Sequence, residues 1–257
     1  MIIVKSNKEI ELMRTACRVT GETLKLMEEN VKPGITTLEL DKLAERFIRE
    51  NGCKPSFKNY NGFPKSICSS VNEQVIHGIP SNNVVLKEGD IISIDVGANY
   101  KGYHGDAART FAVGKISDEA QKLIDVTKDS FFEAVKNCYE GKRISDISTA
   151  VQTRAEGEGY GVVREYIGHG VGASLHEEPE VPNYGTAGHG PRLVPGMTLA
   201  VEPMVNMGTA AVKVLSDGWT VETVDGKPSA HYENTILITK DEPEILTPIN
   251  GDGFYGI

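Results

Sequence analysis

The chain has 257 residues, of which 39% are hydrophobic and 25% are charged, a composition typical of soluble globular proteins. Its 36 acidic residues outnumber its 27 basic residues and give a net charge of -9, which argues against a surface that coats nucleic acid. No segment approaches ~18 consecutive apolar residues, so we expect no membrane span. The four cysteines include no pair at CxxC spacing and fit a reducing compartment. We therefore expect a cytoplasmic protein, and we find no nucleic-acid motif in it.

The first half of the chain predicts two helices followed by a small sheet. Ser6 to Glu9 has the form of a capping box, and an apolar stripe with helical spacing follows it. A second cap at Thr36 to Glu39 opens a helix that should stop at Asn51-Gly52. Residues 53–83 are rich in Gly, Pro, Asn and Ser and predict loops with short strands, whereas residues 84–113 predict a hairpin.

The second half repeats this order. Ser117 should open a helix that ends near Gly141, and residues 144–157 should form a fourth helix. The rest predicts strands and loops, with residues 230–239, AHYENTILIT, as the last clear strand. Helix, helix, sheet, helix, helix, sheet is the order expected of an internal duplication.

A gap-free match between the two halves sharpens this expectation. Residues 86–95, LKEGDIISID, align with residues 193–202, LVPGMTLAVE, so that a leucine, a glycine, large apolar residues and a final acid recur in step. Two similar strands could match by chance. The alternative is a pair of related halves, roughly residues 6–113 and 117–240, each of which delivers a carboxylate from the same place on its sheet.

The hairpin carries two acids, Asp95 and Asp106, on strands that otherwise look buried. Ionised carboxylates are rarely buried unless they are paired or bind a metal. A tight turn over residues 99–102 would place the two side chains opposite each other, with Cβ atoms roughly 4.5–5.5 Å apart. Two carboxylates at that distance repel unless a proton or a cation lies between them. The alternative is a pair of exposed aspartates near a turn.

Two further acids sit on apolar strands. Glu202 follows Leu199-Ala200-Val201, and Glu233 lies within residues 231–238. Each of them could be a surface charge at a sheet edge, but four acids placed in this way favour a shared site.

Histidines accompany these acids. His169 lies between glycines, His176 follows it in a loop, and His77 precedes the first acid strand, although the residues alone do not assign their roles. His104 and His231 each come two residues before a candidate ligand and so share its strand face, either as supports of the ligand or as structural residues.

Five stretches taken together resemble the type I methionine aminopeptidases in their short bacterial form: YNGFPKSICSSVNEQVIHGIP, IDVGANYKGYHGDAA, YIGHGVGASLHEEPEVPNYG, LAVEPMV and YENTILIT. The resemblance covers nearly the whole chain. It implies an α+β pita-bread fold, in which pseudo-two-fold duplicated halves share a curved, mainly antiparallel central sheet flanked by helices. It also implies a single catalytic domain over residues 1–257 and removal of the N-terminal methionine from nascent polypeptides when the second residue is small.

The resemblance further implies a metal centre and its ligands. Two divalent ions would be held by five residues: Asp95, Asp106, His169, Glu202 and Glu233. Asp106 and Glu233 would bridge the ions, Asp95 would chelate one of them, and His169 and Glu202 would complete the other. Four carboxylates and one imidazole suit Mn, Fe, Co or Zn, and the sequence does not choose among them.

Roles in catalysis and substrate binding follow from the same resemblance. Glu202 would act as general base and acid, His176 would stabilise the developing oxyanion, and His77 would contact the scissile amide. The methionine pocket would be lined by Tyr60, Phe63, Cys68, His77, Leu175, His176, Met204 and Trp219. Several of these could instead be core residues. Phe57 stands where the family often has cysteine and Leu175 where it often has a bulkier aromatic residue, so the shape of the pocket stays open.

Two other readings remain. An Xaa-Pro aminopeptidase or prolidase of the same fold would share the ligands, but such enzymes usually carry an additional N-terminal domain. A non-catalytic binding protein of this fold should have lost ligands and tend to be basic, unlike this acidic chain. We expect a monomer that associates at most transiently with the ribosome.

Overall fold

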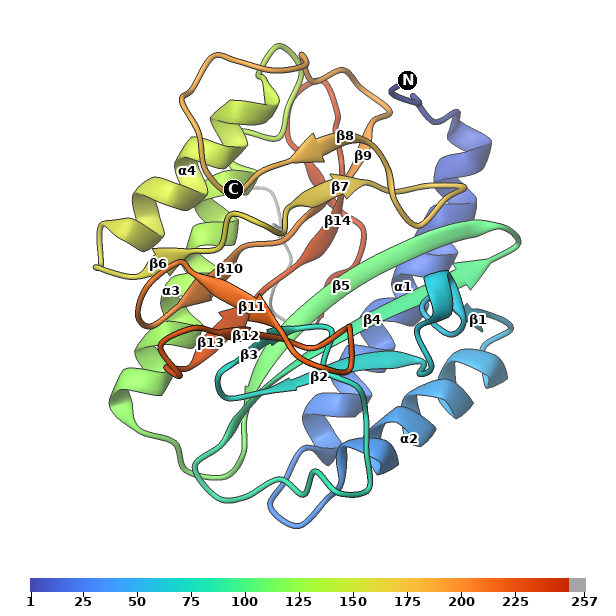
Figure 1. Cartoon of the computed structure of the whole chain (residues 1–257). Helices are drawn as coiled ribbons and strands as arrows, with labels where there is room; N and C mark the ends of the chain where they lie inside the picture. Colours follow the sequence, from blue (N-terminus) through green and yellow to red (C-terminus); the bar gives the residue numbers. More distant parts are fainter. Residues whose placement is uncertain (250–257) are drawn as a thin grey trace.

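Pairs of long helices alternate with groups of strands in the computed structural model, which describes residues 1–249 (Figure 1). The first half contains α1 (Asn7–Asn30), α2 (Thr37–Glu50), β1 (Lys54–Pro55), the short 3₁₀ helix η1 (Tyr60–Gly62), β2 (Ile67–Val71), β3 (Gln74–Ile76), β4 (Ile91–Tyr100) and β5 (Tyr103–Ala112). The second half contains α3 (Asp118–Val135), α4 (Ile144–Glu156), β6 (Gly161–Val162), β7 (Gly168–Gly170), β8 (Glu177–Val181), β9 (Thr198–Val201), β10 (Met204–Asn206), β11 (Val212–Val214), β12 (Val221–Thr223), β13 (Ser229–His231), β14 (Asn234–Leu237) and β15 (Glu244–Ile245).

The helices begin where their caps predict. The Ser6 backbone N–H and hydroxyl both donate to the Glu9 carboxylate, and Thr36 makes the same pair of bonds with Glu39. One helix end was predicted wrongly, because α3 stops at Val135 rather than near Gly141. Beyond it, the Cys138 N–H bonds to the carbonyl of Val135, three residues back, so the last turn is tightened and the chain leaves the helix.

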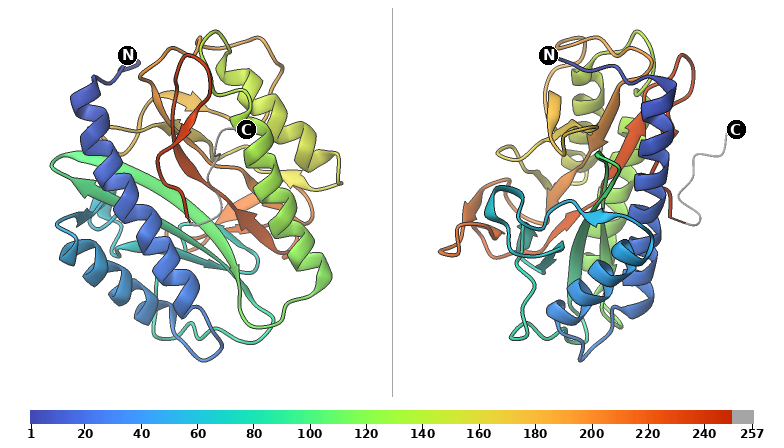
Figure 2. Two further views of the ribbon diagram at one scale, coloured as in Figure 1. Left: turned by 180° about the vertical axis from the view of Figure 1, so that it is seen from behind. Right: turned by 90° about the vertical axis from the view of Figure 1, so that its right-hand side faces the viewer.

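The strands form antiparallel sheets whose helices all lie on one face (Figure 2). In the first half β4 pairs with β1, β2 and β5. In the second half the order is β15-β14-β9-β7-β8. Two smaller three-stranded sheets have the orders β13-β10-β6 and β11-β12-β3, and the first of them packs against α3 and α4. No helix within residues 1–249 is both long and apolar enough to cross a bilayer.

The last predicted strand, residues 230–239, is in fact two strands. β13 pairs with β10, whereas β14 pairs with β9 and β15, so the chain changes sheets at Tyr232-Glu233. The physical reason is a competing partner, since the backbone of Glu233 bonds to Ala108 of β5 instead of continuing either ladder. The single-strand prediction is therefore wrong, and the break places Glu233 at the junction of both halves.

The two halves repeat the same backbone geometry at the aligned segments. β4 starts at Ile91 and β9 starts at Thr198, 107 residues later, which is the offset of the sequence match. The turns that lead into them are alike, because Asp90 N–H bonds to Lys87 O at 3.1 Å and Met197 N–H bonds to Val194 O at 3.2 Å. Each turn also has its glycine at φ +90°, Gly89 in one half and Gly196 in the other.

A pseudo-two-fold axis relates the halves. Ala112 of β5 pairs with the first residue of β4, and Leu237 of β14 pairs with the first residue of β9. Ala108 lies four residues before Ala112, and Glu233 lies four residues before Leu237. Ala108 and Glu233 therefore occupy equivalent positions in the two halves. These two residues bond to each other, with Glu233 N–H to Ala108 O at 2.9 Å and Ala108 N–H to Glu233 O at 3.3 Å. A reciprocal pair between equivalent residues is the contact that a two-fold axis requires, and it lies at the centre of the molecule.

Each half has its own apolar core between helices and sheet. In the first, Leu24 and Leu40 of the helices pack with Ile92 and Ile94 of β4. In the second, Phe131 and Ile147 pack with residues of β9 and β14. Burying a large apolar side chain contributes about 1.5–3 kcal/mol. Two packed halves therefore hold the strand ends between them in fixed positions.

Candidate metal centre

The candidate site begins with the β4–β5 hairpin, whose register differs from the prediction. The turn is Lys101-Gly102, with φ +50° and +89°, so it is the two-residue type I′ turn that suits twisted hairpins. Asp95 therefore pairs with Ala108, and Asp106 pairs with Gly97. The prediction that the two aspartates lie directly opposite each other is wrong. They are diagonal neighbours on one face, still within reach of each other.

The other half brings its acids to the same place. His169 Nε2 lies 3.8 Å from Asp106 Oδ2 and 3.5 Å from Glu202 Oε1, so β7 and the end of β9 face the hairpin. Donor atoms of Asp106, His169 and Glu233 all lie within 4.8 Å of one another, and so do those of Asp95, His231 and Glu233. The five predicted ligands thus converge, with Glu233 common to both groups.

Without a cation, these carboxyls resist ionisation. Burial raises the pKa of Asp95 to about 7 from its usual 3.8. Burial, and then repulsion from neighbouring carboxylates, raises the pKa of Asp106, Glu202 and Glu233 well above the usual range. Charges of one sign gathered out of water are costly unless a proton or a cation compensates them.

His169 is prepared to act as a neutral ligand. Its Nδ1 lies 2.8 Å from the carbonyl oxygen of Gly170, which can only accept, so Nδ1 carries the hydrogen. Nε2 therefore presents its lone pair to the acids. Burial, followed by repulsion from His176, lowers the pKa of His169 to about 3, which keeps the ring neutral. A ring nitrogen fixed by a carbonyl on its other side is the usual arrangement of a metal-binding histidine.

Buried atoms without partners test whether a cation fits here. The buried side-chain atoms of residues 1–249 without a hydrogen-bond partner include Asp95 Oδ1, Asp106 Oδ1, Glu233 Oε1 and His231 Nε2. Leaving such an atom unsatisfied costs about 1–3 kcal/mol. All four belong to this cluster, and they are donor types that bind borderline divalent cations. The residues present therefore fit a metal centre.

Arg109 supports the centre from the opposite strand face. Its buried guanidinium donates to the carbonyl of Glu233 at 2.6 Å and to Asn234 Oδ1 at 2.9 Å, and it stacks on the Tyr232 ring. It therefore fixes the backbone that carries a candidate ligand. Its sequence context, an alternating strand, gives no sign of this role.

A cavity of about 230 Å³ opens directly beside the acids. Its wall contains the four candidate carboxylates and His169 together with Phe57, Tyr60, Asn61, Phe63, Cys68, His77, Leu175, His176 and Trp219. Seven of the eight residues predicted for the pocket line it. The eighth, Met204, does not line it, because it is fully buried and packs with Val75, Ile76 and Val221. Phe57 and Asn61 were not predicted as lining residues. Of the two, only Phe57 was noted in the sequence, because it stands where the family often has cysteine.

Two histidines, His77 and His176, belong to the wall of this cavity. His176 Nδ1 lies 2.9 Å from the Tyr60 hydroxyl, and burial lowers the pKa of His176. When Tyr60 donates to Nδ1, the other ring nitrogen carries the hydrogen and can donate to a substrate. Burial, and then His176, lowers the pKa of His77 to about 4, so it is neutral as well. Its φ of +59° and its edge contacts with Tyr166 and Trp219 fix its position.

A buried ion pair anchors the loop that carries His176. Lys5 Nζ lies 2.6 Å from Glu177 Oε2, and both side chains are at most 5% exposed. The other Glu177 oxygen accepts the Ser174 N–H at 3.0 Å, while Lys5 N–H bonds to Gly196 O. The N-terminal segment is therefore tied to the turn that holds Leu175 and His176.

Replacing Lys5 by methionine is expected to lower the free energy of unfolding by about 3–5 kcal/mol, because it leaves the Glu177 charge buried without its partner. Urea denaturation measures the loss. The double variant Lys5→Met with Glu177→Gln should recover much of it, since no unpaired charge then remains. Equal stability of wild type and the single variant would contradict the pairing.

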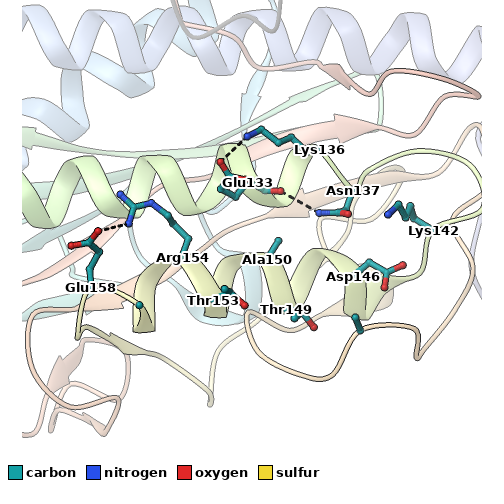
Figure 3. A pocket seen from close by; sticks show the side chains of 12 residues that line it. Glu133, Lys136, Asn137, Lys142, Asp146, Thr149, Ala150, Thr153, Arg154 and Glu158 are labelled. Carbon is teal, nitrogen blue, oxygen red and sulfur yellow. Dashed lines mark hydrogen bonds and ion pairs between the residues drawn. The ribbon is translucent and has the colours of Figure 1, made fainter.

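A larger, more open cleft of about 640 Å³ lies on the outer face between α3 and α4 (Figure 3). Four of its charged side chains pair with one another, with Arg154 2.8 Å from Glu158 and Lys136 2.7 Å from Glu133. Such exposed pairs contribute little, and they leave no convergent reactive groups. Size alone therefore does not make this cleft the functional site.

Comparison with known proteins identifies relatives along nearly the whole chain. The profile of metallopeptidase family M24 matches residues 11–240. The methionine aminopeptidase of Clostridium acetobutylicum is 60% identical over 247 residues, which cover 96% of this chain and 99% of the relative. Methionine aminopeptidase 1 of Bacillus subtilis is 55% identical, and the match covers 97% of this chain and 100% of the relative.

Solved structures agree with this result. A methionine aminopeptidase from Thermotoga maritima superposes with a TM-score of 0.95 at 45% identity, covering 96% of this chain and 99% of that one. A prolidase from Pyrococcus furiosus reaches a TM-score of 0.77 at 23% identity, with 96% of this chain and 66% of the prolidase covered, and shares the fold alone. The predicted α+β pita-bread fold is confirmed.

Proposed function

The chain belongs to metallopeptidase family M24, and on that premise we propose that it is a metal-dependent aminopeptidase that removes the N-terminal methionine of peptides whose second residue is small. The observation that carries the proposal is a cavity lined by apolar side chains together with four candidate carboxylates and a neutral histidine. Its apolar wall suits one hydrophobic side chain, and its acids suit a cation and a free α-amino group.

Asp95, Asp106, His169, Glu202 and Glu233 would hold divalent cations, and we propose two of them. When bound, such cations supply Lewis acidity that polarises a peptide carbonyl and makes water nucleophilic near neutral pH. Mn, Fe, Co and Zn all suit this donor set.

Glu202 is placed to move the proton. Its side chain is 12% exposed, whereas those of Asp106 and Glu233 are 5% and 2% exposed, so Glu202 is more accessible than these two acids. It would take the proton from the attacking water and return it to the leaving nitrogen. His176 would donate to the developing oxyanion, and His77 would contact the scissile amide.

Aromatic and apolar side chains would recognise methionine. Phe57, Phe63, Cys68 and Leu175 form one apolar cluster, and Trp219 packs edge-on to Phe63 at 5.2 Å between ring centroids. A thioether gains from contact with aromatic rings, so methionine is favoured over a branched chain of similar size. We further propose that residues 1–257 act as one catalytic domain, as a cytoplasmic monomer that associates transiently with the ribosome.

Peptide preference tests the proposed function. Protein freed of metal with a chelator is mixed with Met-Ala-Ser, Met-Leu-Ser or an Xaa-Pro peptide, with and without Mn, Fe or Co, and released amino acid is measured. We expect metal-restored release from Met-Ala-Ser alone. Cleavage of only the Xaa-Pro peptide would replace methionine specificity by prolidase chemistry. No cleavage with any metal would favour a binding protein of this fold.

Trp219→Ala should raise KM for Met-Ala-Ser by about 10–100-fold, because it removes apolar contact worth about 1.5–3 kcal/mol. The value of kcat should change little, since the lost contact is equally present in ground and transition states. Steady-state kinetics measures both values. Val214→Ala, at an exposed position of the neighbouring strand β11, is the control. An unchanged KM would remove Trp219 from the pocket.

A further inference from the structure

His231 is a buried histidine that the proposed reaction does not use. It ends β13, is 1% exposed, and its Nε2 has no hydrogen-bond partner among the described residues. This nitrogen lies 3.7 Å from Glu202 Oε2 and 3.8 Å from Glu233 Oε2. These distances are too long for hydrogen bonds, so the nitrogen faces two carboxylates without bonding to either.

The spacing is that of atoms around a common cation. Two donors that are each about 2.1 Å from one ion lie no more than about 4.2 Å apart. His169 Nε2 has the same relation to its neighbours, at 3.5 Å from Glu202 Oε1 and 3.8 Å from Asp106 Oδ2. The two oxygens of Glu202 thus face two imidazoles, one each.

The pseudo-two-fold axis gives an independent reason. Thr235 Oγ1 accepts the Asp106 N–H at 3.0 Å and donates to the Asp106 carbonyl at 2.9 Å. Thr110 Oγ1 does the same for His231, at 2.8 Å and 3.0 Å. His231 therefore occupies in the second half the position that Asp106 occupies in the first. Equivalent backbone sites on both sides of the axis carry residues of metal-binding type.

We propose that His231 is a further ligand of the metal centre and gives its Nε2 to the cation held by Asp95 and Glu233. The inference rests on the proposed metal centre and adds a second imidazole to it. Each cation then has one histidine, His169 for one and His231 for the other. Because imidazole binds borderline ions better than hard ones, this second position should favour Co, Fe or Zn over Mg or Ca.

Cobalt binding tests the assignment without turnover. Metal-free protein is titrated with Co²⁺ by calorimetry, and the loaded protein is examined by X-ray absorption, which counts imidazoles per cobalt. The wild type should bind two ions with an average of one imidazole per cobalt. His231→Gln should bind the second ion at least tenfold more weakly and, when loaded, show about half that count.

The matched control is His104→Gln. His104 precedes Asp106 by two residues as His231 precedes Glu233, but its ring nitrogens bond to Ser56 and Asn99 outside the cluster. This variant should bind cobalt as the wild type does. His231→Asn serves as a second variant if the first does not fold. Wild-type affinity and imidazole count in a folded His231 variant would overturn the assignment, and a wild type that binds no cobalt would overturn the metal centre itself.

Discussion

Glu202→Gln is expected to lower kcat for Met-Ala-Ser by about 10²–10⁴-fold at saturating metal, because the amide cannot accept the proton of the attacking water. Glutamine keeps the size of the side chain and one oxygen donor, so the fold and part of the metal affinity should survive. Stopped assays of released methionine, run at several Mn²⁺ concentrations, separate weaker metal binding from slower chemistry.

Glu133→Gln, on the outer face of α3, is the control and should retain wild-type kcat. Loss of activity that added metal restores to within tenfold of the wild type would contradict the proton-transfer role. Glu202 would then be a ligand only, and another group would have to move the proton.

Asp106→Asn should have opposite effects on metal-free stability and on metal binding. It removes one of several buried carboxylates that repel one another, so the metal-free protein should gain stability near neutral pH. It also removes a proposed ligand of the cations, so added Co²⁺ or Mn²⁺ should raise the melting temperature far less than in the wild type. Thermal unfolding with chelator and with excess metal measures both effects.

The pH dependence of metal-free stability follows from the same carboxyls. Their pKa values are raised in the folded protein, to about 7 for Asp95 and well above normal for Asp106, so the native state holds protons that the unfolded state has released. Stability should therefore be greatest below about pH 4 for these groups and fall as the pH rises through about 7. Each unit of raised pKa corresponds to about 1.4 kcal/mol.

In the metal-free protein, Asp106→Asn should reduce the loss of stability between low and neutral pH by at least about 1.4 kcal/mol. Bound cations should reverse the trend, because they require ionised carboxylates and so bind more tightly as the pH rises. Urea unfolding at several pH values from 5 to 8 checks the sign. A metal-free wild type whose stability rises over that interval would mean that the four acids are not buried together.

Local signals in the sequence predict much of this fold. The caps at Ser6 and Thr36 determine where α1 and α2 begin, because they satisfy backbone groups within three residues. One error is local, because a two-residue turn at Lys101-Gly102 shifts the hairpin register from the one expected. The other comes from a distant partner, since the contact of Glu233 with Ala108 divides the last strand in two and has no local signature.

The candidate site divides in the same way. Acids that follow apolar strands, together with the family resemblance, predict which carboxylates converge, since such residues have few other reasons to be there. Orientation is not predictable from them. Met204 comes two residues after Glu202 but faces the core, where it packs against Val75 and Val221. His231 was left open between support and structure, because its unpartnered nitrogen is visible only in three dimensions.

The central claim is that acids from both halves surround cations at the pseudo-two-fold axis. Anomalous diffraction from crystals grown with Mn²⁺ tests it most directly. We predict two strong peaks, one among Asp106, His169, Glu202 and Glu233 and one beside Asp95 and His231. Peaks found elsewhere, or none between these residues, would contradict the account.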